Sequence, residues 1–255
     1  MIQRLLSHPL MRGRFLDDPG TTQLRKQLIR EKKFLKKIYQ EWYEFIAGEV
    51  VNISGFKLEL GSGAGFMQEV LPDLIKSEIF YEWDIDLVLD GVRLPFPAHQ
   101  LSAIVMTDVF HHISKPHEFI REAVRVLQPG GKIVMIEPWV TRWSRWIYPR
   151  FHHEPLQLDV EEWEFPSSGP LSGANQALPW IIFKRDRERF EREFKDLKII
   201  KIKTMMPFRY LLSGGVSLRS LMPGFTFSFW RWLEETFFNH SGKWGMFALI
   251  VLQVD

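Results

Sequence analysis

A short apolar segment, Leu58–Leu60, runs directly into Gly61-Ser62-Gly63-Ala64-Gly65, with a glycine at every second position. The pattern predicts a strand, a tight turn and a helix. Because glycine has no Cβ, the backbone of such a turn can adopt positive φ and pass close to a ligand. The turn is therefore a candidate binding site for a small molecule.

The spacing and one acidic residue limit what this turn would bind. Gly-x-Gly-x-Gly differs from the Gly-x-Gly-x-x-Gly of dinucleotide-binding folds. Glu59, two residues before the first glycine, would repel a pyrophosphate but attract an ammonium or a sulfonium. The turn alone does not decide, since similar turns also occur for packing reasons.

A second acidic residue is predicted at the end of the next strand. Leu74–Glu78 reads as that strand, and a carboxylate at its carboxyl end commonly binds ribose hydroxyls in doubly wound sheets. Glu78 is the candidate for this role. Asp84 or Asp86 would replace it if the strand covered Ile79–Trp83 instead.

Further strands alternate with helices and short connections. They are predicted at Phe56–Leu60, Leu74–Glu78, Ile85–Asp90, Leu101–Thr107, Lys132–Glu137, Leu197–Ile202 and Phe247–Val254. This alternation predicts an α/β fold with a doubly wound, mostly parallel seven-stranded sheet, whose ligand binds at the carboxyl ends of the strands. The glycine turn, Glu78, Asp90 and Asp108 all fall at such ends.

The N-terminal region is predicted to be helical and basic. Apolar residues recur at intervals of three, four and seven between residues 21 and 49, the pattern of one helix face. The other face carries seven basic residues and one acidic residue between positions 25 and 37. Such a helix can lie on an anionic membrane or bind an acidic substrate, although a solvated face is the commoner case. We assign residues 1–52 to a helical extension packed on a core domain of residues 53–255.

Composition excludes several classes of protein. The 255 residues are 45% hydrophobic and 25% charged, as in ordinary globular proteins, and a net charge of +2 gives no reason to expect a nucleic-acid partner. The absence of cysteine excludes disulfides and thiolate catalysis. No apolar run approaches the roughly 20 residues that span a bilayer, and residues 1–15 lack a signal-peptide pattern. We expect a cytoplasmic protein, with peripheral contact to the inner face of a membrane as an open alternative.

Two insertions interrupt the pattern of strands and helices, at residues 138–180 and 204–244. The first contains tryptophans among prolines and glycines, typical of a lid or a substrate wall. Trp143, Trp146 and Tyr148 could stack on an acceptor or form an aromatic core under the lid. The second contains the apolar, aromatic stretch Leu221–Phe238, for which burial against the core is the default and contact with lipid or another subunit the alternative.

Histidines follow the fourth strand and recur in the first insertion. His111 and His112 are placed where a general base could act on a substrate, with loop structure and substrate contact as the other roles. His152, His153 and Glu154 form a second polar cluster. No third ligand has an evident spacing, so the sequence predicts no metal site.

Four motifs in order resemble the class I S-adenosylmethionine-dependent methyltransferases, in particular the small-molecule "type 11" group. They are LELGSGAG, LDGVRLPFP, LSAIVMTDVFHHI and EAVRVLQPGGKIVMIEP, and the resemblance covers about residues 55–137. It implies a Rossmann-like methyltransferase fold with S-adenosylmethionine as cofactor. The residues that it assigns to the cofactor, from the methionine part through the ribose and adenine to the border at the fourth strand, are Glu59, Gly61, Ser62, Gly63, Gly65, Glu78, Asp90, Gly91, Asp108 and Val109.

The resemblance implies methyl transfer to a small or amphipathic acceptor by in-line displacement. The cofactor brings the reactivity, and the protein supplies orientation and desolvation. Two alternatives stay open at this point: a nucleotide-sugar or dinucleotide enzyme, and a non-catalytic member that binds the cofactor or a partner. The four motifs do not identify the acceptor or the methylated atom, because residues outside the motifs determine both.

Overall fold

The computed structural model describes residues 8–11, 19–152, 154–166, 169, 173–238 and 242–255. Its sheet has the strand order β3-β2-β1-β4-β5-β7-β6. The strands are β1 Phe56–Leu60, β2 Leu74–Glu78, β3 Leu87–Val88, β4 Leu101–Thr107, β5 Leu127–Pro138, β6 Leu197–Met205 and β7 Phe247–Val254. Neighbours from β3 to β5 are parallel, whereas β7 is antiparallel to both β5 and β6. The predicted doubly wound, mostly parallel seven-stranded sheet is thus confirmed.

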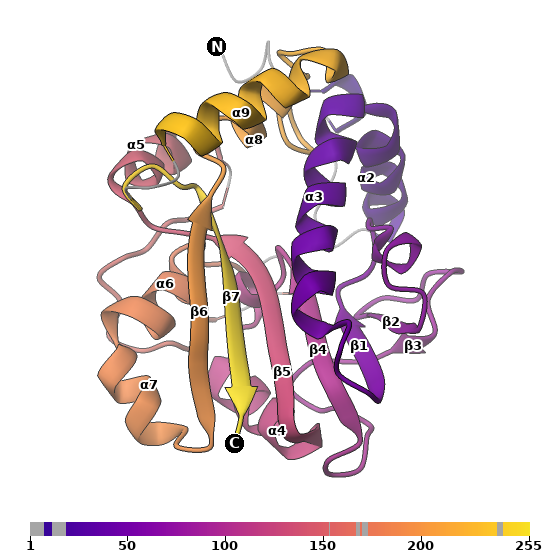
Figure 1. Cartoon of the computed structure of the whole chain (residues 1–255), viewed down its shortest axis with the longest axis vertical. Coiled ribbons are helices and arrows are strands. Elements are labelled where there is room, and N and C mark those ends of the chain that lie inside the picture. Colours follow the sequence, from indigo (N-terminus) through magenta and orange to yellow (C-terminus); the bar gives the residue numbers. More distant parts are fainter. Residues whose placement is uncertain (1–7, 12–18, 153, 167–168, 170–172, 239–241) are drawn as a thin grey trace.

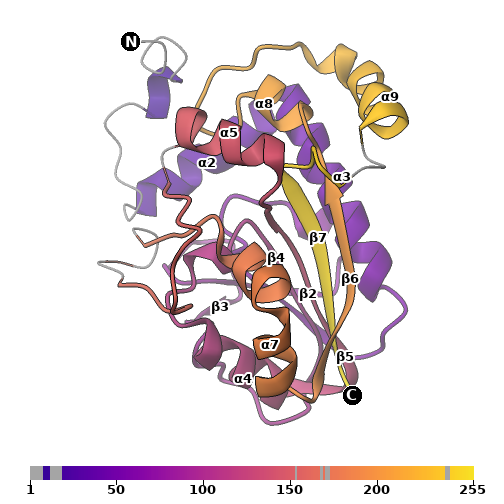
Figure 2. The ribbon, with the colours of Figure 1, turned by 90° about the vertical axis from the view of Figure 1, so that its left-hand side faces the viewer.

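Helices cover both faces of the sheet and one of its ends (Figures 1 and 2). The α-helices are α2 Pro19–Glu31, α3 Lys33–Val50, α4 Pro116–Val126, α5 Arg142–Phe151, α6 Leu178–Trp180, α7 Arg187–Glu193, α8 Arg209–Ser213 and α9 Phe227–Phe237. Short 3₁₀ turns are η1 Pro9–Met11, η2 Met67–Glu69, η3 Phe110–His112 and η5 Gly224–Thr226, and η4 Ile181–Arg185 is a π-helix. Within the described part of the chain, no helix combines the length and apolarity needed to cross a bilayer.

The central strands are buried on both faces, which explains their apolar sequences. In β4, Ile104 and Met106 point to one face and pack with α4, η4 and α7. Ala103 and Val105 point to the opposite face and pack under α3. Alternate side chains of each strand therefore belong to two separate cores, one on each side of the sheet.

The single helix predicted between residues 21 and 49 is wrong, because the chain breaks at Lys32 into α2 and α3. Lys32 has φ −78° and ψ 87°, outside the helical region. Its ammonium donates to the carbonyls of Gly215 and Leu218, about 180 residues further along the chain. This long-range contact ends α2 where the local pattern would continue it.

A cap built from the N-terminal helices and both insertions lies beyond the carboxyl ends of β4 and β5. Figure 1 shows α8 and α9 crossing the top of the molecule, next to α2 and α3. A buried ion cluster joins three of these helices: Arg209 of α8 donates two hydrogen bonds to Glu41 of α3, at 2.7 and 2.8 Å, and one to Glu234 of α9. The cap therefore closes the sheet end at which the site is expected.

Candidate active site

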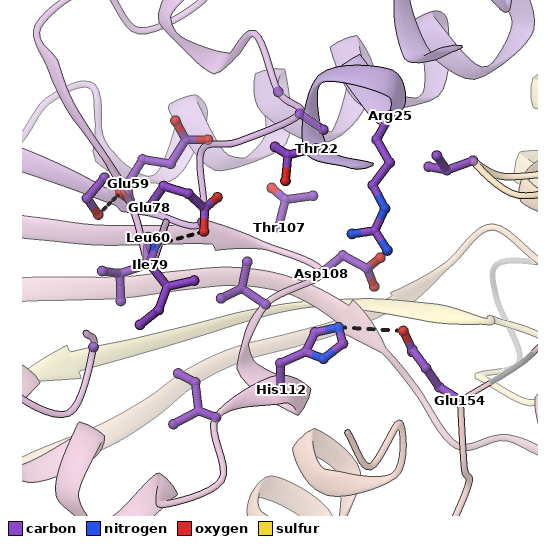
Figure 3. Close-up of a pocket in the computed structure, with 18 of the residues that line it drawn as sticks. Thr22, Arg25, Glu59, Leu60, Glu78, Ile79, Thr107, Asp108, His112 and Glu154 are labelled. Carbon is purple, nitrogen blue, oxygen red and sulfur yellow. Dashed lines mark hydrogen bonds and ion pairs between the residues drawn. The ribbon is translucent and has the colours of Figure 1, made fainter. Parts of the chain in front are cut away.

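A cavity of about 600 Å³ lies between the carboxyl ends of β1 to β4 and the cap. The strand ends supply one wall through the glycine turn and the residues that follow β2, β3 and β4. The opposite wall comes from α2, α3, α8 and the segment after α5. Figure 3 shows acidic side chains on the first wall and Thr22 and Arg25 of α2 facing them. The volume is that of a typical small-molecule or cofactor site.

The glycine turn is shaped by side chains that approach it from other elements. Gly61 has φ +70°, and a Cβ there would lie 2.5 Å from Val109. A Cβ at Gly63 would lie 2.5 Å from the Glu78 carboxylate and 2.7 Å from the Thr22 methyl group. These positions require glycine because neither leaves room for a side chain.

Glu78 holds the turn and faces the cavity. Its Oε2 accepts a hydrogen bond from the Gly63 amide at 3.0 Å, and its Oε1 accepts one from the Ile79 amide at 2.8 Å. Burial raises the pKa of Glu78, and the two backbone hydrogen bonds oppose that shift. Each oxygen keeps a lone pair for a ligand hydroxyl. Its predicted contact with ribose stays a prediction.

Glu59 lies on β1, lines the same wall of the cavity and is 4% exposed. Burial raises its pKa to about 7, and the neighbouring Glu78 charge adds to the shift. Ser62, beside it in the turn, accepts a hydrogen bond from the Ser77 amide at 3.1 Å and so binds the turn to β2. A buried carboxyl of this kind is suited to a positively charged ligand, which would favour its ionised form.

Asp90 and Gly91 lie at the outer edge of the cavity, after β3. The Asp90 carboxylate accepts a hydrogen bond from the Val92 amide at 3.1 Å, which closes the turn. Asp108 and Val109 lie at the end of β4. Asp108 has φ +61°, an uncommon conformation for a residue other than glycine. Burial raises the pKa of Asp108 to about 7, and the charge of His111 lowers it in part.

The two candidate histidines are in different environments. His111 is 1% exposed and lies behind the cavity wall, where its Nδ1 donates to Glu137 at 2.7 Å and its Nε2 lies 3.3 Å from Glu154. Burial alone would lower the pKa of His111, but the two carboxylates outweigh it and raise the pKa well above its usual value.

His112, by contrast, lines the cavity. Its Nδ1 donates to the Gly173 carbonyl at 3.1 Å, and its Nε2 lies 3.6 Å from Glu154 (Figure 3). Burial lowers the pKa of His112 to about 4, and the positive charge of His111 adds to the shift. Of the two candidate bases, only His112 can touch a molecule bound in the cavity.

Several cavity residues were missed by sequence reasoning, and all but Thr107 lie outside the motifs. They are Thr22, Arg25, Tyr39, Tyr43, Thr107, Tyr210, Val216 and Ser217. The signal for α2 was the spacing of Thr22, Arg25 and Ile29, which share one helix face, but Arg25 was grouped with the solvated basic face. In Figure 3 Arg25 points toward Asp108. Thr107 Oγ1 is buried and finds no hydrogen-bond partner within the described ranges, so it can serve a ligand.

The residues predicted for the first insertion divide between the cavity and the core. His152 and Glu154 line the cavity, whereas His153 lies outside the described residues. Trp143 stacks on Trp146 with ring centroids 5.7 Å apart, and the buried Tyr148 hydroxyl donates to the Met246 carbonyl. These three aromatic residues do not appear among those that line the cavity. All three belong to α5, which is part of the cap.

The strand order and the cavity at the strand ends define a class I, Rossmann-like methyltransferase fold. Residues 58–135 match a family model described as "Methyltransferase domain", the type 11 group that the motifs resemble. This segment of the chain is thus similar to the methyltransferase domain of a family whose methyl donor is S-adenosylmethionine.

Curated relatives match only part of the chain. Demethylmenaquinone methyltransferase of Tropheryma whipplei is 30% identical over a stretch that covers 28% of this chain and 37% of that protein. The chain therefore spans little more than a third of the curated relatives it matches.

Two solved structures are similar in fold. One is a methyltransferase from Thermotoga maritima described as a possible histamine N-methyltransferase, with a TM-score of 0.53, 13% identity, and coverage of 91% of this chain and 99% of that one. The other is geranyl diphosphate C-methyltransferase of Streptomyces coelicolor A3(2), with a TM-score of 0.50, 15% identity, and coverage of 98% and 91%. At these identities the likeness concerns the fold alone.

Proposed function

We propose that the protein transfers a methyl group from S-adenosylmethionine to an amphipathic acceptor that reaches the cavity from a lipid surface. The observation that carries this proposal is the continuity between the cavity and an exposed aromatic helix. Val216 and Ser217 line the cavity, and the chain continues from them through η5 directly into α9.

The acidic wall is suited to the cofactor. Glu59 and the glycine turn would face its cationic methionine part, and Glu78 would face its ribose hydroxyls. Asp90 with Gly91 would border the adenine, and Asp108 the centre of the cavity. Burial raises the pKa values of Glu59, Glu78 and Asp108 in this wall, and a bound cation would favour their ionised forms.

The opposite wall, together with His112, is suited to the acceptor. Tyr39, Tyr210 and Glu154 of that wall offer hydroxyl and carboxylate groups, and His112 at the end of the strand-end wall offers an imidazole. In the reaction, the acceptor atom bonds to the methyl carbon as the carbon–sulfur bond breaks, which leaves S-adenosylhomocysteine. A hydroxyl acceptor also loses its proton, and this proton would pass to His112 or Glu154, which adjoin each other in the cavity.

The surface of α9 is suited to lipid. The exposed fractions are 84% for Phe225, 56% for Phe229, 55% for Trp232 and 64% for Phe237. Aromatic side chains of this kind favour the membrane–water interface. Lys37 of α3 lies near the start of α9, where it donates to the Gly224 carbonyl at 3.1 Å and contacts the Phe227 ring, so a cation adjoins this helix. Cations near such a surface favour anionic lipid.

Calorimetric titration with S-adenosylmethionine and S-adenosylhomocysteine tests the first part of the proposal. We expect one site per chain for each compound, and no heat from either would reject methyl transfer. Turnover is then measured on a panel of hydroxyl and amine amphiphiles that includes demethylmenaquinone, the acceptor in the name of the T. whipplei relative. Cofactor binding without turnover on any acceptor would favour the non-catalytic alternative.

Co-sedimentation with vesicles tests the lipid contact. The double variant Phe229→Ser/Trp232→Ser should lower binding to anionic vesicles about tenfold or more, because burying one large apolar side chain stabilises by about 1.5–3 kcal/mol. Tyr81→Ser is the matched control, since Tyr81 is 77% exposed but lies in the segment after β2 and not on η5 or α9. Binding that is equal for neutral and anionic vesicles, or equal for the two variants, would count against the proposal.

A further inference from the structure

We infer that Nε2 of His111, Nε2 of His112 and the Glu154 carboxylate form a binding site for one divalent metal ion of the Zn²⁺ class. His111 Nε2 lies 3.3 Å from one Glu154 oxygen, and His112 Nε2 lies 3.6 Å from the other. All three ligand atoms fall within 4.8 Å of one another. Two ligands at about 2.0–2.1 Å from a tetrahedral zinc ion are about 3.3 Å apart, so one ion fits between these atoms with a small adjustment.

Both imidazole rings are oriented as a metal requires. His111 Nδ1 donates to Glu137 at 2.7 Å, and His112 Nδ1 donates to the Gly173 carbonyl at 3.1 Å. Each Nε2 points toward Glu154, and the proton that His111 Nε2 carries in the metal-free protein would be released when an ion binds. An outer carboxylate or carbonyl on the far ring nitrogen is the usual support of a metal-binding histidine.

Glu137 in turn is fixed by the backbone. Its Oε1 accepts hydrogen bonds from the amides of Val109 and Phe110, at 2.8 and 2.7 Å, and the side chain is fully buried. The end of β5 thus positions the loop after β4, which carries both histidines. This rigidity favours a preformed site, because little ordering remains to be done when the ion binds.

The choice of ion follows from the ligand atoms. Two imidazole nitrogens and one carboxylate are typical of zinc and of other first-row divalent ions, whereas Mg²⁺ and Ca²⁺ prefer oxygen ligands. Three protein ligands also leave a coordination position open. His112 and Glu154 line the cavity, so that position faces its interior.

The sequence prediction of no metal site is revised by this geometry. The ligands come from two segments of the chain, because Glu154 follows His111 by 43 residues. A local spacing pattern in the sequence therefore cannot reveal them. The predicted polar cluster in the first insertion contributes Glu154, and the histidines come from the loop after β4. His152 lies beside the site, with its Nδ1 3.6 Å from Glu154, and it also contacts Gln176.

The role of the ion in catalysis rests on the proposed function. An acceptor hydroxyl in the open position would bind the ion through its oxygen and become more acidic, as metal-bound water does. Its proton would pass to solvent, and the resulting oxyanion would attack the methyl carbon as the carbon–sulfur bond breaks. Metal binding itself does not depend on this role.

Titration of the metal-free 255-residue chain with Co²⁺ tests the site without any acceptor. We expect visible d–d absorption that saturates at one Co²⁺ per chain and disappears when Zn²⁺ is added. His112→Gln and Glu154→Gln should each weaken Co²⁺ binding by more than the about 10–100-fold that loss of an outer-shell partner costs. Thermal unfolding shows whether the variants are folded.

His117→Gln is the matched control, because His117 forms a similar pair with Glu193, at 2.9 Å, remote from the cavity. It should bind Co²⁺ as the unchanged protein does. Absence of the d–d bands in the unchanged protein, or equal Co²⁺ affinity in all variants, would overturn the inference. The contact between His111 and Glu154 would then be a hydrogen bond that shares a proton, and not part of a metal site. Calorimetry with S-adenosylmethionine on the same samples distinguishes this failure from failure of the proposed function.

Discussion

The two walls of the cavity are built in different ways. In the strand-end wall, interacting residues are close in sequence: the Gly63 amide and Glu78 are 15 residues apart, and Val109 and Glu137 are 28 apart. In the cap, Arg209 and Glu41 are 168 residues apart, and Lys32 and Leu218 are 186 apart. The first wall is a local structure of successive strand ends, whereas the second exists only when distant segments meet.

This difference suggests a division of labour. The strand-end wall carries the family motifs and would bind the cofactor that the whole family shares. The cap contains the insertions and would bind the acceptor. Variants should therefore separate the two: those in the strand-end wall should affect cofactor affinity, and those in the cap should affect stability and acceptor use.

The largest expected effect is that of Arg209→Met on the free energy of unfolding. The change leaves Glu41 and Glu234 buried without their cation, and breaking such a pair costs about 3–5 kcal/mol. The melting midpoint should fall by about 2–4 °C per kcal/mol, as measured by calorimetry. Arg231→Met is the control: Arg231 also contacts Glu41 but is 45% exposed, and the loss should stay below about 1 kcal/mol. Equal losses would show that the buried cluster does not hold the cap.

Gly63→Ala should weaken cofactor binding by about thirtyfold or more, since a clash of this kind costs about 2 kcal/mol. Its Cβ would displace the Glu78 carboxylate and Thr22. Gly48→Ala is the control, because a Cβ there meets no atom within 4 Å. Calorimetric titration with S-adenosylmethionine measures both. If Gly63→Ala bound as tightly as Gly48→Ala, the turn would not be the cofactor site.

Glu59 should make cofactor affinity depend on pH. Burial raises its pKa from 4.5 to about 7, so the free protein holds a neutral carboxyl below pH 7 and a carboxylate above it. A cationic ligand favours the carboxylate, and affinity should therefore rise by up to about tenfold from pH 6 to 8 and then level off. The same shift means that ionising Glu59 opposes folding, so its contribution to the stability of the free protein falls as pH rises from 4.5 to 7.

Glu59→Gln removes this titration and should flatten the profile. Glu69→Gln is the control, since the Glu69 side chain is 60% exposed and lies outside the cavity. Titrations at several pH values with each variant make the measurement. A profile that keeps its slope without Glu59 would assign the pH dependence to another group.

The smallest expected effect is that of Thr141→Ala, which removes a local motif within the cap. Thr141 Oγ1 accepts from the Ser144 amide at 3.1 Å, and Ser144 Oγ accepts from the Thr141 amide at 2.8 Å, which caps α5. Loss of a cap costs about 1 kcal/mol, measurable by denaturant unfolding. A loss as large as that of Arg209→Met would contradict the view that long-range contacts dominate the cap.

Most of the strand-end wall could be predicted from the sequence, and most of the cap could not. The strands Leu101–Thr107 and Phe247–Val254 have the predicted bounds, because buried strands have nearly continuous apolar sequences with clear ends. The predicted bounds of Leu74–Glu78 also hold. The third strand is shorter than predicted, at Leu87–Val88, and β5 begins five residues earlier, at Leu127. The motif residues consequently lie where the topology requires, although their contacts with a cofactor stay predictions.

For the cap residues, the neighbouring sequence did not predict their roles. Arg25 was indistinguishable from its lysine neighbours until the fold placed its helix over the cavity, and Glu154 was one polar residue in a loop. Lys32 had no local reason to end a helix. Tertiary contacts decide all three, and no pattern of residue spacing encodes them.

The packing of α3 against β7 has a consequence for the order of folding. The Trp42 ring of α3 contacts the Phe247 ring of β7, with centroids 4.8 Å apart. A helix made within the first 50 residues thus finds part of its core only after residues 247–254 leave the ribosome. That part of its apolar face stays uncovered while about 200 further residues are made, a period in which exposed surface favours aggregation or chaperone binding. Cellular yield should therefore depend on translation and chaperone supply more than the equilibrium stability of the protein suggests.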